Sequence, residues 1–485
     1  MVTEFAYLFI WGLSGLAIAR ALELRGLIAV PIGFALGIAL FVALGVVQIV
    51  ANVSTSPIWT LTGTLLVGLA VWLWKVHSRP SPKQWLALAL SGPALALTVF
   101  GLRKLNWIGW HSDIFRYLLA GSVLGINRVD LLSLNLITKR MAVYPLLLAP
   151  ASDSSELHFA SLTPLLAVAT LWILGWLLWW ASSTRASFSR TERALAVVVV
   201  LALLVTNNRF VWHASYLNGH LVFAAYLLLL SGCGWLRVRT QAIQPAACVV
   251  IQSASAIVVA LDRPEGPLVA ALALLPFTFH TKLSRFERHT PMLALGSVLF
   301  VWYAWVGWRY IVFGVSIPSS CSGIWGLSVL LLAIPYLSQS PRLTFVFKRV
   351  LLLTELTLWV GLLGMAVRSP RILLDSLRAV VQNTVQDRAS WGSSIWILAL
   401  LVSISLIATR SPERHLLRFP VTTFVPLSFL LAYFRHEAYR DGDRDSLARM
   451  LFHFVPLSAL LIGVSLFAEW RLPWRSRVSA PEAQI

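Results

Sequence analysis

Long apolar segments follow one another along almost the whole chain, separated by short polar connections. Most of them have about 20 residues, the length that an α-helix needs to cross the apolar core of a bilayer. Backbone polar groups must be paired within each spanning segment, and the alternation of a barrel strand is absent, so the pattern predicts helices. We expect an all-α, polytopic transmembrane helical bundle of about fifteen spans. The predicted spans are 5–21, 27–51, 58–75, 84–102, 161–182, 194–208, 215–235, 244–261, 267–280, 292–314, 323–338, 344–366, 392–409, 417–434 and 449–468.

Composition supports a membrane protein and leaves little room for a soluble domain. Of 485 residues, 58% are hydrophobic and 12% are charged, about half the charged fraction of soluble proteins. The formal net charge of +19 could suggest a nucleic-acid partner. Lysine and arginine are instead spread through short loops, so we expect no nucleic acid and attribute the charge to a cytoplasmic bias, with contacts to anionic lipid as an addition. The N-terminus lacks the features of a cleaved signal, so 5–21 is expected to remain as the first span.

Sorting the charged residues by connection tests the orientation, with the N-terminus placed outside and the spans alternating. One set of connections is short and basic, as cytoplasmic loops should be. The opposite set contains every aspartate of the chain. The pattern therefore predicts a multi-pass protein with an outside N-terminus and a cytoplasmic C-terminus. The aspartates are Asp113, Asp130, Asp153, Asp262, Asp375, Asp387, Asp441, Asp443 and Asp445.

The outside connections are also the long ones, and they divide the chain. We expect N-terminal transmembrane helices over 1–102, a large extracytoplasmic loop over 103–160, and a transmembrane core with a short cytoplasmic tail over 161–485. Amphipathic helices are predicted at 114–124 and 129–147 within the large loop. A third, over 368–391, is predicted to lie on the membrane surface.

The first cluster of candidate chemistry is the segment WHSDIFRYLLA at 110–120. Asp113 and Tyr117 are four residues apart and share one face of a helix. A carboxylate there can take a proton from a hydroxyl group, which makes Asp113 a candidate base. Alternatively, Asp113 or Ser112 only caps the helix.

The second cluster, at 207–220, contains His213 and His220, which share one helical face if the helix extends that far. No carboxylate lies beside them in sequence, so hydrogen bonding or phosphate contact is favoured over metal binding. Simple packing at the membrane interface is the other explanation. We assign no metal ligand.

The third cluster is the turn DRPEG at 262–266, squeezed between two predicted spans. Carboxylates and an arginine beside lipid are costly unless they pair or line a cavity. Arg263 could therefore pair with Glu265 in a self-neutralised turn, or could hold a ligand. The fourth cluster, 435–453, begins as a solvated loop but ends with Arg449 and His453 entering the last span.

These clusters belong together because all four are predicted on one membrane face. They would supply carboxylates, histidines and arginines around one cavity. A carboxylate suits proton abstraction, and an arginine can hold a phosphate through two hydrogen bonds.

In this order the motifs resemble the GT-C superfamily, polytopic glycosyltransferases that use polyprenyl-phosphate-linked sugars. The likeness is greatest to bacterial arabinofuranosyl- and mannosyltransferase-like members. It covers about half the chain, near 100–280 and 449–456. The family's helix form Asp-x-x-x-Tyr-x-x-Ala is matched by Asp113, Tyr117 and Ala120. Its Arg-Pro-acidic-Gly turn is matched by Arg263-Pro264-Glu265-Gly266. Its late Arg-Tyr-Leu-x-Pro-like entry into a span is similar to Arg449-Met450-Leu451 with Pro456.

The chain departs from this family in several respects. Three spans precede the one that normally opens the fold. The loop around His213 lacks the acidic residue often found there, so a divalent cation stays open as a possible cofactor and no cofactor is assigned. There is no Trp-Trp-Asp signature and no large C-terminal extracytoplasmic domain.

The resemblance implies a function. A sugar would move from a polyprenyl-phosphate donor to a glycan, lipid or protein acceptor on the extracytoplasmic face of a bacterial cytoplasmic membrane, with inversion at the anomeric carbon. Asp113 would be the base, Glu265 would orient sugar or acceptor, and Arg263, His213 and Arg449 would neutralise the leaving phosphate. Arg116, Tyr117 and His220 complete the implied substrate-binding set.

Other readings of the pattern remain. A secondary transporter or flippase of a lipid-linked or anionic substrate would also place charged residues among spans. A lipid-linked glycan polymerase or ligase would share the long outer loop and the arginine and histidine chemistry. A non-catalytic assembly subunit would not depend on Asp113.

Overall fold

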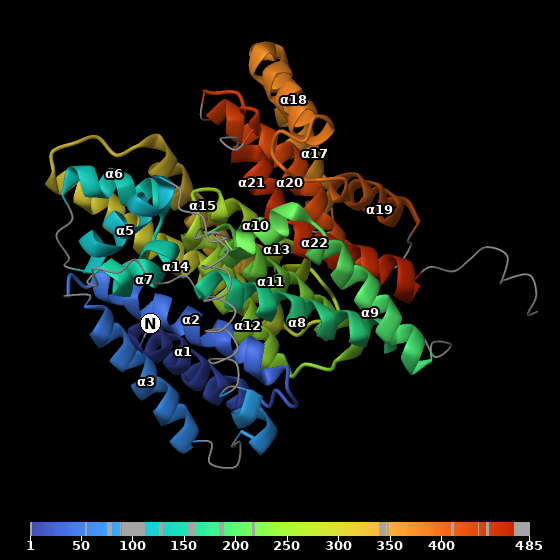
Figure 1. Ribbon diagram of the computed structural model, residues 1–485. Helices are drawn as coiled ribbons and strands as arrows, with labels where there is room; N and C mark the ends of the chain where they lie inside the picture. The colour runs from blue at the N-terminus through green and yellow to red at the C-terminus, as the bar shows by residue number, and fades with distance from the viewer. Residues whose placement is uncertain are drawn as a thin grey trace, which may run out of the picture.

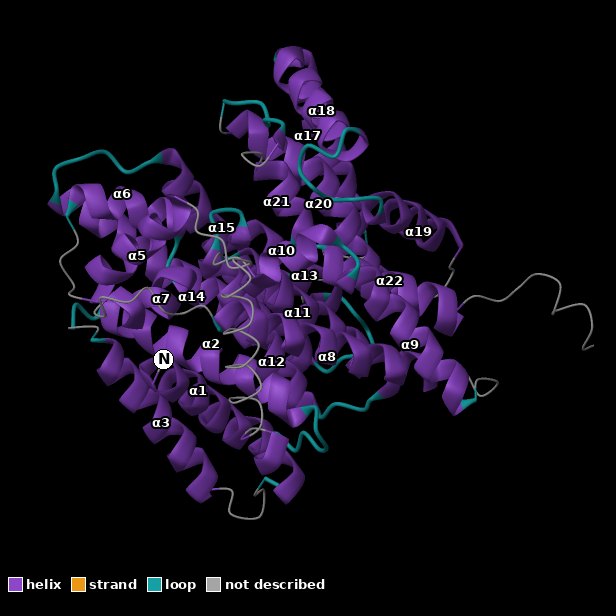
Figure 2. Cartoon of the chain, in the orientation of Figure 1, coloured by secondary structure: helices purple, strands orange, loops and turns teal. Residues whose placement is uncertain are grey.

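A computed structural model describes residues 2–53, 56–74, 80–87, 89, 112–125, 130–152, 161–183, 189–215, 219–338, 346, 349–408, 412–434, 436–442 and 446–469. Throughout these ranges the chain is helical, with turns and short connections and no strand (Figure 2). The all-α class predicted from the apolar runs is therefore confirmed for the described part of the chain.

Nine helices in the described ranges are long and apolar enough to cross a membrane. A tenth span results if α9 (Arg190–Val205) and α10 (Asn208–Ser215), which are bent by 71° at their junction, cross together. Four shorter apolar helices match further predicted spans, and most of predicted span 84–102 lies outside the described residues. A membrane-embedded protein is thus supported, while the count of about fifteen spans stays a prediction. The nine are α2 (Ala29–Val50), α3 (Pro57–Trp74), α8 (Leu162–Ser183), α11 (His220–Thr240), α12 (Pro245–Asp262), α14 (Arg285–Val312), α15 (Ser319–Leu337), α17 (Val350–Arg368) and α20 (His415–Phe434).

Helix α11 lies at the centre of the bundle. Figure 1 shows it between the N-terminal helices α1 (Val2–Ala21), α2 and α3 on one side and α17, α18 (Pro370–Val385) and α19 (Ser394–Ala408) on the other. Its spanning window is 94% buried, against 6% for α17. With 21 residues, α11 is about 30 Å long, which matches the thickness of a bilayer core. The two ends of α11 therefore carry the two polar regions described below.

The predicted large outer loop contains three short helices among its described residues. Helix α5 (Ser112–Gly125) occupies the first predicted amphipathic stretch. The second stretch is divided, because Met141 has a positive φ of 58° and separates α6 (Leu131–Arg140) from α7 (Val143–Ser152). The Ala142 amide donates to Leu261 O of α12 at 2.9 Å. Residues 143–150 of α7 are buried, so α7 is a packing element that attaches this region to the end of α12.

Helix α18 buries polar residues and exposes apolar ones. Ser376 and Asn383 accept hydrogen bonds from the amides of Tyr439 (3.1 Å) and Gly442 (2.7 Å), which fixes this face against segment 436–442. The opposite face exposes a stripe of four residues, and its placement on a membrane stays a prediction. The stripe is formed by Leu374, Leu377, Val381 and Val385.

We predict that this stripe lies in the bilayer interface, because apolar side chains at helical spacing prefer lipid to water. A nitroxide at Leu377→Cys in reconstituted protein should collide more with lipid-soluble oxygen than with a water-soluble nickel chelate. A label at Asp375→Cys, also exposed, should show the reverse. Equal access of the nickel chelate to both labels would contradict this placement.

Candidate functional site

The candidate site is built around the turn that joins α12 to α13 (Gly266–Thr278). Arg263 is extended (φ −144°, ψ 154°) and ends α12, while Pro267 stands in the first turn of α13, where proline is well tolerated. A Cβ at Gly266 would lie 2.1 Å from Val259 O, so only glycine fits there. The tight turn fixes the Arg263 backbone at the end of two packed helices.

Three acceptors from different parts of the chain hold the Arg263 guanidinium. Nε donates to Glu265 Oε1 at 3.2 Å, and Nη1 lies 3.2 Å from Tyr117 Oη and 3.4 Å from His220 Nε2. Among the described residues Nη2 has no hydrogen-bond partner, and the Arg263 side chain is 14% exposed. The arginine is therefore fixed in orientation and keeps one edge available for an anion.

The charge of Arg263 is strongly favoured where it stands. Burial alone lowers its pKa, but Tyr117, Glu265 and Asp262 raise it by more, so the net shift is upward. A buried cation with fixed geometry and an open edge is suited to binding a phosphate or carboxylate.

Two further histidines extend the cluster behind Arg263. His220 Nδ1 lies 2.8 Å from His453 Nε2, and the His453 ring stacks on Phe223 with centroids 4.2 Å apart. The His213 ring of α10 lies 5.1 Å from that of His220. All three imidazoles are buried. The cluster thus joins α10, the start of α11, and the turn between α21 (Ser446–Phe452) and α22 (Val455–Gly463).

Asp262 is a buried carboxyl group beside Arg263. It is 1% exposed, and its two carboxylate oxygens have no hydrogen-bond partner in the described part of the chain. They lie against Gly219 at the start of α11, where a Cβ would be 3.0 Å from Oδ1. Burial raises the pKa of the nearby Tyr144 hydroxyl, and Tyr117 and Asp262 raise it further, so this hydroxyl stays neutral.

Four of the residues implied by the resemblance meet at Arg263, which contacts Tyr117, His220 and Glu265. The predicted pairing of Arg263 with Glu265 is present, and it coexists with an open guanidinium edge.

The other implied residues are less tightly connected to this group. His213 contacts the His220 ring, and Arg449 is half-buried and close enough for its charge to act on His220. Arg116 is exposed on α5. Asp113 is in the first turn of α5, and its side chain lies outside the described residues.

Two buried residues of the site, Asp262 and His453, were named in the sequence clusters without an assigned role. The signal that could have found His453 is its spacing: it is four residues after Arg449 at the entry to a span.

Among the described residues no group of three or more His, Cys, Asp and Glu side chains could hold a metal ion. The described part of the chain therefore offers no ligand set for the divalent cation that the resemblance leaves open.

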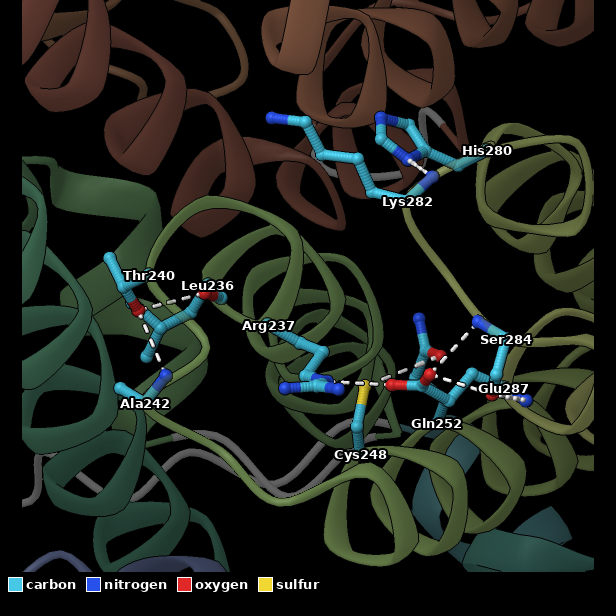
Figure 3. A network of polar contacts seen from close by, with 10 residues as sticks. All are labelled: Leu236, Arg237, Thr240, Ala242, Cys248, Gln252, His280, Lys282, Ser284 and Glu287. Atoms are coloured by element: carbon cyan, nitrogen blue, oxygen red, sulfur yellow. Dashed lines mark hydrogen bonds and ion pairs between the residues drawn. The ribbon is translucent and has the colours of Figure 1, made fainter.

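A second polar network lies at the opposite end of α11 and α12. Arg237 Nε donates to Glu287 Oε1 at 2.6 Å, and Ser284 and Glu287 form the capping box of α14 (Figure 3). Glu413 forms ion pairs with Lys282, whose Nζ lies 2.6 Å from Oε1, and with Arg239, whose Nη1 lies 3.6 Å from Oε2. These bonds fix α11 to the start of α14 and to the start of α20.

We predict that the ion pair between Glu287 and Arg237 contributes more to the free energy of unfolding than the helix cap that Glu287 forms. Glu287→Gln keeps a capping-box residue but removes the charge beside Arg237, which is 16% exposed. We expect a loss of about 2 kcal/mol, since a largely buried arginine loses its partner. Glu287→Ala should cost about 1 kcal/mol more. Thermal unfolding in detergent measures both, and a cycle with Arg237→Gln isolates the pair. Equal stability of Glu287→Gln and the parent would contradict the prediction.

No protein family model, curated protein or solved structure matches this chain.

Proposed function

We propose that the chain is a membrane glycosyltransferase that moves a sugar from a polyprenyl-phosphate donor to a glycan, lipid or protein acceptor. The carrying observation is the Tyr117–Arg263 contact of 3.2 Å. It joins the helix that contains Asp113 to the turn that contains the available arginine. A base and an anion site are thereby attached to one another, as a displacement on a phosphate-activated sugar requires.

In the proposed reaction, Asp113 takes the proton of the acceptor hydroxyl as that oxygen bonds to the anomeric carbon. The bond from this carbon to the phosphate oxygen breaks, and polyprenyl phosphate leaves with the electron pair. Attack opposite the leaving group inverts the anomeric carbon. Arg263, with Arg449 and His213 nearby, stabilises the charge that develops on the phosphate. Glu265 holds Arg263 and can orient a sugar hydroxyl through its second carboxylate oxygen.

Asp113 belongs in this step because of its position on α5. It precedes Tyr117 by four residues, about 6 Å along a helix, and so lies one turn from the residue that contacts Arg263. The predicted orientation places this end of the bundle on the extracytoplasmic side of a bacterial cytoplasmic membrane. Donor and product would then share the membrane with the protein.

The direct test measures sugar transfer from a panel of polyprenyl-phosphate sugars in membranes that contain the parent protein or Asp113→Asn. We expect transfer by the parent and a loss of about 10²-fold or more in the variant at equal expression, the usual contribution of a general base. Full turnover by Asp113→Asn would remove this base assignment. Absence of transfer from every donor by folded protein would remove the proposal.

A secondary transporter or flippase of an anionic or lipid-linked substrate is the second candidate, because the site contains interrupted helices. The 71° bend between α9 and α10 lies just before His213, and His453 lies in the break between α21 and α22. Transporters bind substrates at such breaks. Uptake or flipping of a substrate by reconstituted protein without any covalent transfer would favour this candidate.

A further inference from the structure

Three side chains of the candidate site form a row of hydrogen bonds. Arg263 Nη1 lies 3.4 Å from His220 Nε2, and His220 Nδ1 lies 2.8 Å from His453 Nε2. His220 is 2% exposed and His453 is fully buried. Each imidazole therefore meets its neighbour through a defined ring nitrogen in a buried position.

The donor-only chemistry of Arg263 and the shorter bond to His453 together decide where the protons of this row lie. A guanidinium only donates, so His220 Nε2 must accept and cannot have a hydrogen. A neutral His220 then has its proton on Nδ1 and donates it to His453 Nε2. His453 is consequently protonated on Nδ1. A proton on His220 Nε2 would set two donors against each other.

Packing alone does not explain a histidine at position 453. Its Nδ1 has no hydrogen-bond partner within the described ranges, although it is buried, and such an orphan donor costs stability. A phenylalanine would stack on Phe223 equally well and would bury no polar atom. What a phenylalanine cannot do is accept the His220 proton.

We infer that His453 is a positioning residue that fixes the tautomer of His220. The proton position of an imidazole is set by the hydrogen bond that its other nitrogen makes. By holding the proton on Nδ1, His453 keeps Nε2 as a permanent acceptor for Arg263 and leaves the Nη2 edge of the guanidinium open. The chemical use of this device, holding a leaving phosphate, rests on the proposed glycosyltransferase function.

The protonation pattern can be measured without any assay of activity. In protein labelled with ¹⁵N-histidine and reconstituted in lipid, His220 should show a protonated Nδ1 and an unprotonated Nε2, with signals assigned by comparison with His220→Gln. His453→Phe, which keeps the ring stacked on Phe223, should weaken this pattern, because the 2.8 Å bond to His453 is shorter than the 3.4 Å contact with Arg263 and contributes more to holding the proton on Nδ1. His453→Gln, whose amide oxygen can accept, should keep it. A protonated Nε2 on His220 in the parent protein, or an unchanged pattern in His453→Phe, would overturn the inference.

Binding of geranyl phosphate in micelles connects the tautomer to the site. We expect affinity about tenfold lower in His453→Phe and within about threefold of the parent in His453→Gln, as one hydrogen bond to a charged group predicts. Parent affinity in His453→Phe would overturn the positioning role. If the parent shows the expected tautomer but binds no geranyl phosphate, the effect of His453 on His220 stands and the proposed function loses its phosphate site.

Discussion

Replacing Arg263 with lysine should lower the rate of sugar transfer by about 10²–10³-fold, although the positive charge is kept. The guanidinium uses two nitrogens to reach Glu265, Tyr117 and His220 and has a third left over. A lysine ammonium is a single point on a flexible stem and cannot hold these three acceptors and an anion together. Loss of one fixed donor to a developing negative charge typically has this magnitude.

The measurement is the single-turnover rate with a polyprenyl-phosphate sugar, in membranes with equal amounts of each protein. Arg371→Lys is the matched control, because Arg371 is exposed on α18, away from the site. Thermal unfolding is followed in parallel, since Arg263 also ties α5 to α12. Turnover within threefold of the parent for Arg263→Lys would show that any cation suffices and that the fixed geometry is not used.

Sequence periodicity was sufficient to predict the helices but not the contacts among them. Apolar runs of membrane length mark α2 or α11 without any knowledge of their neighbours. The hydrogen bond between Tyr117 and Arg263 joins positions 146 residues apart, and nothing local to either position indicates the other. The pairing of Arg263 with Glu265 was predictable because the two residues share one tight turn.

The sequence also did not predict two helix boundaries, because contacts with residues outside the segment determine the backbone conformation there. Residues 209–214 lie between two predicted spans, and the sequence left open whether a helix extends through them; Asn208–Ser215 forms α10. Asn207 caps that helix through Oδ1 on the Phe210 amide, and its Nδ2 donates to Ser394 of α19. The predicted stretch 129–147 likewise breaks at Met141, next to the Ala142 bond to α12. Both breaks depend on partners far away in sequence.

Replacing Gly37 with valine should prevent α1 and α2 from packing and destabilise the protein by more than about 4 kcal/mol, the range of the most damaging single changes. A Cβ at Gly37 would lie 1.8 Å from Trp11 O, and one at Gly33 would lie 2.9 Å from the Leu16 backbone. These obstacles are backbone atoms, which cannot rotate away. Small residues let spanning helices approach this closely, and in lipid such packing is a main source of association.

Gly364→Val is the matched control, because Gly364 also lies within a spanning helix and nothing stands within 4 Å of its Cβ position. Its stability should change only by the small difference in helix propensity between the two residues, which favours valine. Yield of folded protein and thermal unfolding in detergent measure both variants. Similar stability of Gly37→Val and Gly364→Val would mean that α1 and α2 do not pack as described.

The displacement of α2 by Gly37→Val should also affect the candidate site. Tyr226 of α11 donates its hydroxyl proton to Ala35 O of α2 at 2.6 Å, six residues from His220. A displaced α2 therefore leaves a buried hydroxyl without an acceptor and loosens the helix that presents His220 to Arg263. Any fraction of Gly37→Val that does fold should bind geranyl phosphate more weakly than the parent, whereas Tyr226→Phe, which removes the hydroxyl without moving α2, should weaken binding less.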